Sequence, residues 1–349
     1  MIMATEDPVS IEIPGNSHVL SMRNDELLFP YLKKYGSDFM AYSGLQPGLE
    51  YFLMDNIGYI AFRRFHHPIL APKGISFVIS DPICARDNYE TIIAHFLERM
   101  GKSSFLMVTK EVAMALRSFG LHINQFGAAS EIDVQSFNIK GKEKEHLRRW
   151  KNKAAKEGVE VIESDVRYIE KAQLEKVNSE WIRKKGGKEY ILMHRPFMWD
   201  HEEDVRFFWA LKEGELVGMV GFDPMYKDNK VVGYYKNFLR MSDDAPHGTS
   251  VLVTLAAIEK FRYEGGIERV CFGISPFSNL NRNDLNDSNT LYLASRFMHK
   301  YCGFIYPFKG NEFHKKRYGG AKKEFYYSSL PEGSKIMQLL TALKALGCF

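Results

Sequence analysis

Residues 232–261, with the sequence VGYYKNFLRMSDDAPHGTSVLVTLAAIEKF, predict a strand, a polar turn and a helix in succession. The β-branched and aromatic residues at the start favour a strand, and the apolar run 251–258 favours a helix. The turn 244–249 joins them and contains a proline and a glycine, which are typical turn residues. A helix that begins at such a turn offers free backbone N–H groups and the positive end of its dipole. The stretch therefore predicts a place where a phosphate or a carbonyl oxygen can bind.

The same alternation of strands and helices extends to both sides of this stretch. Short apolar runs predict strands at 51–54, 59–63, 75–79, 105–108 and 131–134, and from residue 159 onward at 207–211, 216–222, 231–239 and 269–272. Helical patterns cover 89–100, 111–119, 172–185, 251–262 and the closing segment 334–346. The sequence thus predicts an α/β protein with two units of similar plan, at 1–139 and 159–349, joined by a helix at 140–158.

The composition is that of a globular chain, with 349 residues of which 45% are hydrophobic. Its apolar runs are far shorter than the roughly 20 residues that span a bilayer, and its start shows no basic segment followed by an apolar one. We therefore expect neither a membrane span nor a signal peptide. The four cysteines are scattered, and His66 and His67 have no third ligand at suitable spacing, so we expect reduced thiols and no metal site.

The segment 140–158, KGKEKEHLRRWKNKAAKEG, is the most basic part of the chain. It holds eight Lys or Arg residues against three Glu and ends in a glycine, a pattern that predicts a capped helix. Lys142, Arg148, Arg149 and Lys151 would form a positive ridge able to engage nucleic-acid phosphates. A solvated helix face has the same composition, so both interpretations stay open.

Several motifs, in their order and spacing, resemble the catalytic domain of the phosphatidylglycerol lysyltransferases, the multiple peptide resistance factor family. The matching residues in the first part are Asp81, Pro82, Lys140, Gly141, Lys142, Leu147, Arg148 and Gly158, with Ser80 where the family has glycine. Those in the second part are Trp181, Gly187, Lys188, Glu189, Tyr190, Arg240, the turn 244–249, Gly273, Pro276, Ser278, Tyr306, Phe308, Gly310, Lys315, Arg317 and Tyr318. The agreement of independent signals over most of the chain supports the resemblance.

The resemblance implies two tandem GNAT-like domains, each a mixed central sheet flanked by helices, with catalysis in the second. It implies a transferase that moves an amino acid from aminoacyl-tRNA to a phosphatidylglycerol-like lipid or to a small hydroxyl or amine compound. No cofactor is expected, and the single glycine of the turn 244–249 argues against coenzyme A as the donor. The protein would work in the cytoplasm, free or in peripheral contact with the inner face of the membrane.

Two departures from the family pattern leave parts of this interpretation open. Ser250 and Val251 stand where an acidic residue is expected, and Gly319 and Gly320 replace a proline and a tryptophan. The amino acid, the acceptor and the oligomeric state are therefore not fixed by the resemblance. The alternatives are an acyl-CoA-dependent N-acyltransferase and a non-catalytic protein that binds RNA or a membrane surface.

Four residues are candidates for catalysis of the implied reaction. Lys315 and Arg317 would stabilise the tetrahedral oxyanion or hold a phosphate, and an extended segment would place both side chains on one face. Glu189 would bind the amino acid or act as a base, and His247 would carry a proton because the pKa of histidine lies near neutrality. Surface cations, a salt bridge and a solvated turn histidine are the respective alternatives.

Seven further residues are candidates for substrate binding. They are Arg240, Asp243, Asp244, Gly248, Thr249, Ser278 and Tyr318. The two carboxylates would pair with the ammonium group of the amino acid or cap the turn locally. Arg240 would hold a phosphate or support the turn, and burial of its side chain would favour support.

Overall fold

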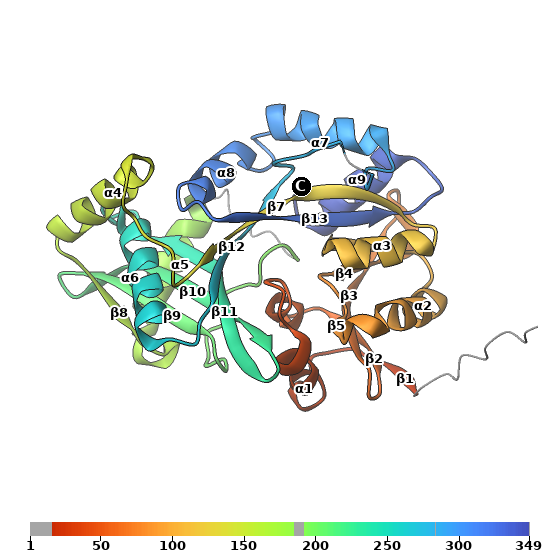
Figure 1. Cartoon of the computed structure of the whole chain (residues 1–349), viewed down its shortest axis with the longest axis horizontal. Coiled ribbons are helices and arrows are strands. Elements are labelled where there is room, and N and C mark those ends of the chain that lie inside the picture. Colours follow the sequence, from red (N-terminus) through yellow and green to blue (C-terminus); the bar gives the residue numbers. More distant parts are fainter. Residues whose placement is uncertain (1–15, 185–191, 283, 349) are drawn as a thin grey trace, which may run out of the picture.

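A computed structural model of the protein describes residues 16–184, 192–282 and 284–348. The strands of these residues form one mixed sheet with the order β1-β2-β3-β4-β6-β13-β7-β12-β11-β10-β9-β8, and β5 pairs with β3 at its side. Figure 1 shows the helices arranged around this sheet, with α2 and α3 at one end and α4 and α6 at the other. The sheet is therefore the common frame of the whole molecule.

The first unit is an antiparallel meander that ends in a parallel strand pair. Its strands are β1 (Ser17–Leu20), β2 (Glu50–Met54), β3 (Gly58–His67), β4 (Ala71–Ile79), β5 (Ile83–Cys84), β6 (Ser103–Val108) and β7 (His122–Asp133), and its helices are α1 (Asp25–Tyr35), α2 (Tyr89–Met100) and α3 (Lys110–Ser118). Strands β2, β3 and β4 pair antiparallel, and β4 then pairs with β6 in parallel. The strands and helices predicted for this unit match β2, β6, α2 and α3 to within two residues at their ends. Strand β3 ends four residues after the predicted strand, β4 begins four residues before it, and β7 begins well before it.

The second unit repeats this plan. Its strands are β8 (Val159–Glu163), β9 (Arg206–Lys212), β10 (Glu215–Lys227), β11 (Lys230–Met241), β12 (Arg269–Pro276) and β13 (Ala321–Ser329), and its helices are α5 (Lys171–Lys184), α6 (Thr249–Glu264), α7 (Asn289–Tyr301), α8 (Phe308–Lys316) and α9 (Lys335–Ala345). Strands β8 to β11 pair antiparallel, and β11 pairs with β12 in parallel. The predicted α/β architecture of two similar units is confirmed.

The two units exchange their last strands. β13 lies between β6 and β7 of the first unit, and β7 in turn pairs with β12 of the second. The register joins Phe325 of β13 to Gly127 of β7, and Cys271 of β12 to Glu131 of β7. The units predicted at 1–139 and 159–349 thus follow one another along the chain, while in space they share a continuous sheet.

The basic segment between the units forms the predicted helix, α4 (Glu145–Lys156), and Gly158 follows it with a φ of +79°. Leu147 and Ala154 of α4 are fully buried in one apolar cluster with Val253 and Phe261 of α6. Helix α6 is therefore covered on two sides, by the sheet and by α4, which explains why its sequence is apolar almost all round. Within the described residues, no helix is both long enough and apolar enough to cross a membrane.

Candidate active site

The strands β11 and β12 of the second unit separate part way along their length. They pair in parallel at only three positions, the last of which joins Tyr235 to Cys271, although both strands continue. A Cβ on Gly273 would come within 2.7 Å of the Tyr235 ring, and Gly273 has a φ of +75°, so glycine is required where the strands part. In the first unit, β4 stays paired with β6 up to its last residue, Ile79. The opening between strands therefore belongs to the second unit.

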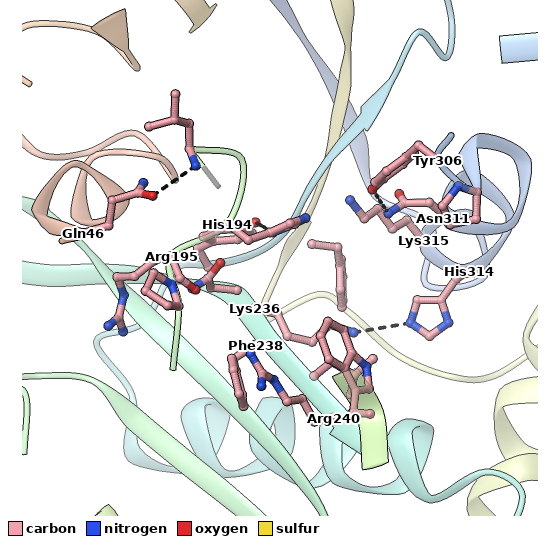
Figure 2. A pocket seen from close by; sticks show the side chains of 18 of the residues that line it. Gln46, His194, Arg195, Lys236, Phe238, Arg240, Tyr306, Asn311, His314 and Lys315 are labelled. Atoms are coloured by element: carbon pink, nitrogen blue, oxygen red, sulfur yellow. Dashed lines mark hydrogen bonds between the residues drawn. The ribbon is translucent and has the colours of Figure 1, made fainter. Parts of the chain in front are cut away.

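A cavity of about 670 Å³ lies at this opening. Figure 2 shows side chains of residues that line it. The first unit contributes Gln46, Pro47, Gly48 and Arg63 to its wall. The second unit contributes residues 235–240 of β11 and, among others, His314 and Lys315 of α8. Five Lys or Arg side chains line the cavity, and none of the described lining residues is Asp or Glu. The described walls are thus apolar surfaces with an excess of positive charge.

Lys236 lies in the wall of this cavity with its amine between aromatic rings. Its Nζ is 5.0 Å from the centre of the Phe272 ring, 5.2 Å from that of Tyr318 and 3.5 Å from Nε2 of His314. Burial lowers the pKa of Lys236 to about 7. Burial and three neighbouring cations lower the pKa of His314 to about 3, so this imidazole is neutral at pH 7. Lys236 can therefore gain and lose a proton near neutral pH.

Lys315 is the second buried amine of the cavity. The prediction that residues 315–317 are extended is wrong, because α8 continues to Lys316 and residues two apart in a helix point in different directions. Lys315 accordingly lines the cavity and Arg317 does not. Nζ of Lys315 donates a hydrogen bond to the carbonyl oxygen of Ile274 at 2.5 Å. Burial lowers the pKa of Lys315 to about 7, and the charge of Lys236 acts in the same direction.

Arg240 lines the cavity at the far end of β11. Its side chain is buried, and its guanidinium carbon lies 4.6 Å from the ring centre of Trp181 and 4.2 Å from that of Phe238. Guanidinium groups stack well on such rings. The burial favours a role in supporting the wall over an exposed contact with phosphate.

The segment 192–196 closes the cavity between the two units. The backbone N–H of Leu192 donates to Oε1 of Gln46 in the first unit at 3.1 Å. Arg195 is buried and donates to both carboxylate oxygens of Asp223, at 2.6 and 3.1 Å, and also to Glu202. Because two carboxylates neutralise Arg195, the positive character of the cavity comes mainly from its other cations.

The two carboxylates predicted to bind an ammonium group lie on the surface, outside the cavity. Asp243 pairs with Arg183 and, at 2.6 Å, with Lys184, while a carboxylate oxygen of Asp244 lies 3.7 Å from Nζ of Lys176. All three cations belong to α5. These pairs fasten the turn to that helix, which agrees with the interpretation of a local role.

The start of α6, predicted as an anion-binding position, packs against α4. A Cβ on Gly248 would come within 2.2 Å of the carbonyl oxygen of Trp150, and Gly248 has a φ of +97°. Thr249 is buried, and its hydroxyl donates to the carbonyl oxygen of Pro246 at 2.7 Å. His247 is exposed, with its ring 5.5 Å from that of Trp150. These turn residues therefore do not line the cavity.

The remaining candidates from the sequence make contacts of different kinds. Ser278 is buried and donates to a backbone carbonyl at 2.8 Å near the end of β12. Tyr318 is buried and stacks on Phe272 at 4.4 Å, so it supports Lys236 from behind. Arg317 lies over a neighbouring phenylalanine ring at 4.5 Å. Glu189 lies outside the described residues.

The four cations proposed for nucleic-acid binding divide into two pairs. Arg148 donates to two backbone carbonyls of the preceding loop at 2.5 and 2.7 Å, and Lys151 pairs with Glu259 of α6 at 2.9 Å. Lys142 and Arg149 have exposed side chains. The second pair is therefore better placed than the first to meet a phosphate.

Sequence reasoning missed two of the cavity's central residues, Lys236 and His314. A signal for Lys236 was present, because it is the one charged residue within the apolar run 231–239, and a buried amine there is costly without a function. No comparable signal marks His314, since its proximity to Lys236 arises from the packing of α8 beside β12.

Comparisons with known proteins agree with this architecture. Residues 31–328 match the family model described as phosphatidylglycerol lysyltransferase, C-terminal. A phosphatidylglycerol lysyltransferase from Bacillus subtilis (strain 168) is 22% identical over 307 residues, which are 84% of this chain and 33% of that protein. The chain thus spans about a third of the length of that curated relative.

Solved structures show the same fold at low sequence identity. The structure of L-PGS from Bacillus licheniformis is similar with a TM-score of 0.76 and 20% identity, covering 94% of this chain and 98% of that one. The C-terminal domain of a putative lysylphosphatidylglycerol synthetase from Agrobacterium fabrum gives a TM-score of 0.73 and 16% identity, covering 91% and 95%. These likenesses confirm the predicted α/β fold of two similar units. With the family model matched over most of its length, this chain belongs to the phosphatidylglycerol lysyltransferase C-terminal family, a family of transferases.

Proposed function

We propose that this protein moves an amino acid from aminoacyl-tRNA to the hydroxyl group of a phosphatidylglycerol-like lipid, or to a small hydroxyl or amine compound. The observation that carries this proposal is the cavity between β11 and β12, in which two amines, Lys236 and Lys315, are buried with pKa values lowered to about 7. Groups with such pKa values are suited to proton transfer near neutral pH.

In this reaction the neutral amine of Lys236 accepts the proton of the acceptor hydroxyl. The hydroxyl oxygen attacks the ester carbonyl carbon, and a tetrahedral oxyanion forms. When it collapses, the bond to the ribose oxygen of the tRNA breaks, and that oxygen takes the proton from Lys236. The neutral His314, 3.5 Å from Lys236, and the rings beneath the amine hold it in place for both transfers.

In its protonated form, Lys315 contributes positive charge from the α8 side of the cavity. Its hydrogen bond to Ile274 fixes the ammonium group and leaves its other N–H groups for a ligand in the cavity. A preorganised donor of this kind stabilises an oxyanion or a phosphate without reorganisation during the reaction. The excess of cations among the described lining residues suits the phosphate of the lipid headgroup or of the tRNA terminus.

The packing of α4 supports tRNA over coenzyme A as the donor. Trp150 of α4 lies against Gly248 at the start of α6, beside the helix end that would otherwise be available for a pyrophosphate. The same helix presents Arg149 to solvent, and Lys142 is exposed just before it. Helix α4 thus covers the start of α6, where an anion would otherwise bind, and adds a basic surface of its own. A working place in the cytoplasm, in peripheral contact with the membrane, belongs to the same proposal.

The test is transfer from a mixture of radiolabelled aminoacyl-tRNAs in the presence of phosphatidylglycerol vesicles and a small-molecule extract. Lipid and aqueous products are separated, and the labelled amino acid is identified. We expect label in one product fraction, and little in a matched reaction with Lys236→Met. Absence of transfer from every tRNA, together with coenzyme A bound to the purified protein, would replace this proposal with acyl-CoA-dependent acylation.

A further inference from the structure

Helix α7 carries a row of large apolar side chains on its solvent side. Leu293, Phe297 and Tyr301 are spaced four residues apart, so they lie along one face, and their exposed fractions are 52%, 58% and 58%. The rings of Phe297 and Tyr301 contact one another, with centroids 5.1 Å apart. Single exposed apolar residues are common on protein surfaces, whereas a contiguous row marks an interaction site.

The opposite side of the same helix already serves the core. Leu291, Tyr292, Ser295 and Met298 are buried there, and α7 packs against α8 and α9. The apolar row is therefore not needed to hold the helix in the fold. It is an additional apolar face that is exposed to solvent in the isolated chain.

Two further exposed aromatic residues lie beyond the end of α7. Phe304, in the turn that follows, is 86% exposed, and Phe313 of α8 is 61% exposed. The two helices are joined by a hydrogen bond of 3.1 Å between His299 and Glu312. Figure 1 shows α7 and α8 side by side along one border of the molecule. Leu293, Phe297, Tyr301, Phe304 and Phe313 are called the aromatic rim below.

The charged residues of α7, α8 and the turn between them are almost all positive. Residues 289–318 contain six Lys or Arg, of which Lys315 is buried in the cavity wall, and a single acidic residue, Glu312, which accepts a hydrogen bond from His299. Lys300 and Lys309 are exposed next to the rim. Aromatic side chains flanked by cations favour the interface of an anionic bilayer, where rings enter the headgroup region and cations meet lipid phosphates.

We propose that the aromatic rim of α7 and α8 docks on the surface of an anionic lipid bilayer and presents the cavity to its acceptor. This inference rests on the proposed function with a lipid acceptor. Helix α8 links the two sites, because it carries Phe313 on its outer side and supplies Gly310, Asn311, His314 and Lys315 to the cavity wall. Docking at the rim brings lipid headgroups to the border of the cavity, so that the lipid acceptor remains in the membrane during transfer.

The apolar part of the proposal is tested with Phe297→Ser combined with Tyr301→Ser. Co-sedimentation with vesicles of phosphatidylglycerol and phosphatidylcholine in equal parts should show binding weakened about tenfold or more, because two half-exposed rings no longer enter the interface. The matched control is Tyr263→Ser, at the end of α6, where the ring is 91% exposed but isolated from the rim. Equal loss in the control and in the double variant would overturn the proposal.

The electrostatic part is tested with Lys300→Gln and Lys309→Gln, against Lys153→Gln and Lys156→Gln in α4. Each lost charge at the rim should weaken binding to phosphatidylglycerol vesicles about fivefold, and the wild-type protein should bind pure phosphatidylcholine poorly. Unchanged vesicle binding by the rim variants overturns the proposal. The proposal is also overturned if the only effect of the rim variants is to convert a dimer to a monomer in analytical ultracentrifugation.

Measuring transfer to two forms of the lipid acceptor separates membrane docking from the transfer reaction. Rim variants should lose transfer to vesicle phosphatidylglycerol but keep transfer to a short-chain, monomeric phosphatidylglycerol, and their thermal melts should match the wild type. Full transfer to both forms by the rim variants would overturn docking and leave the proposed function standing. Vesicle binding through the rim without any transfer by the wild type would overturn the proposed function alone.

Discussion

Replacement of Lys236 by methionine should stabilise the protein while removing its activity. Methionine is unbranched and of similar length, so it fits among Phe272, Tyr318 and His314 without a buried amine. None of the described residues that line the cavity supplies a carboxylate for Lys236. The charged form of the lysine is therefore costly in the folded state.

The size of the effect follows from the pKa of the amine. A fall from 10.5 to about 7 corresponds to roughly 5 kcal/mol of folding free energy, at about 1.4 kcal/mol for each pKa unit. The folded pKa is the lower one, so the unfolded chain holds more protons between pH 7 and pH 10.5. Stability therefore rises with pH across that window, and the full penalty is present below pH 7. Lost ring contacts with the ammonium group offset part of the gain.

We expect Lys236→Met to raise the free energy of unfolding by about 3 kcal/mol at pH 6 and by about 1 kcal/mol or less at pH 9.5. Urea titrations at both pH values measure this difference. Lys230→Met, an exposed position on the same strand, is the control and should change stability little at either pH. A variant that is less stable than wild type at pH 6, or a gain that is equal at both pH values, would refute the reasoning.

The same substitution should affect the reaction in a way that a structural role would not. Loss of a general base lowers the rate of transfer about 100-fold or more. The rise of kcat/KM through pH 7 should disappear from the pH profile of the residual activity, because the titrating amine is gone. If the variant is more stable but keeps both its rate and its pH profile, Lys236 is a buried lysine without a part in catalysis.

Three further substitutions address other parts of the site. Lys315→Met should lower single-turnover transfer about 100-fold with little loss of stability, and an unchanged rate would exclude it as an oxyanion donor. Lys142→Glu with Arg149→Glu should weaken tRNA binding and reduce the salt dependence by about one unit for each lost phosphate contact, measured by filter binding at several salt concentrations; an unchanged slope would remove these residues from the interface. Gly248→Ala should lower the free energy of unfolding by about 2 kcal/mol in urea titrations, because its Cβ meets the carbonyl of Trp150, and a neutral result would contradict this packing.

Much of the fold could be predicted from the sequence because its strands and helices have strong periodic patterns. Helix α6 and strands β10 and β11 follow directly from apolar runs bounded by turn residues. Helices α1, α7 and α8 were not predicted. Pro30 lies inside α1 and Gly310 inside α8. Both residues disfavour helices in isolation, and only tertiary contacts compensate for this.

The site was less predictable, because its residues come together through packing. Lys315 was predicted as a site residue and lines the cavity, but it lies in a helix and not in the extended segment that the prediction assumed. Asp243 and Gly248 of the turn were predicted to bind a ligand. In the structure, Asp243 pairs with a lysine of α5, and Gly248 packs against α4. Which helix covers a turn depends on contacts between distant segments, and a local pattern does not contain that information.

The two units exchange their last strands. For this reason the first unit, whose strands β4 and β6 stay paired, can influence the position of residues around the cavity in the second unit. Lys315 is fixed at one end of its helix by the carbonyl of Ile274 in β12. The chain then turns at once into β13, which is held inside the first unit. Gly320 makes this turn possible, because it has a φ of +93° and a Cβ there would lie 2.2 Å from the carbonyl oxygen of Glu131 in β7. The position of Lys315 relative to Lys236 therefore depends on strand pairing in both units, and the first unit acts as part of the active-site frame.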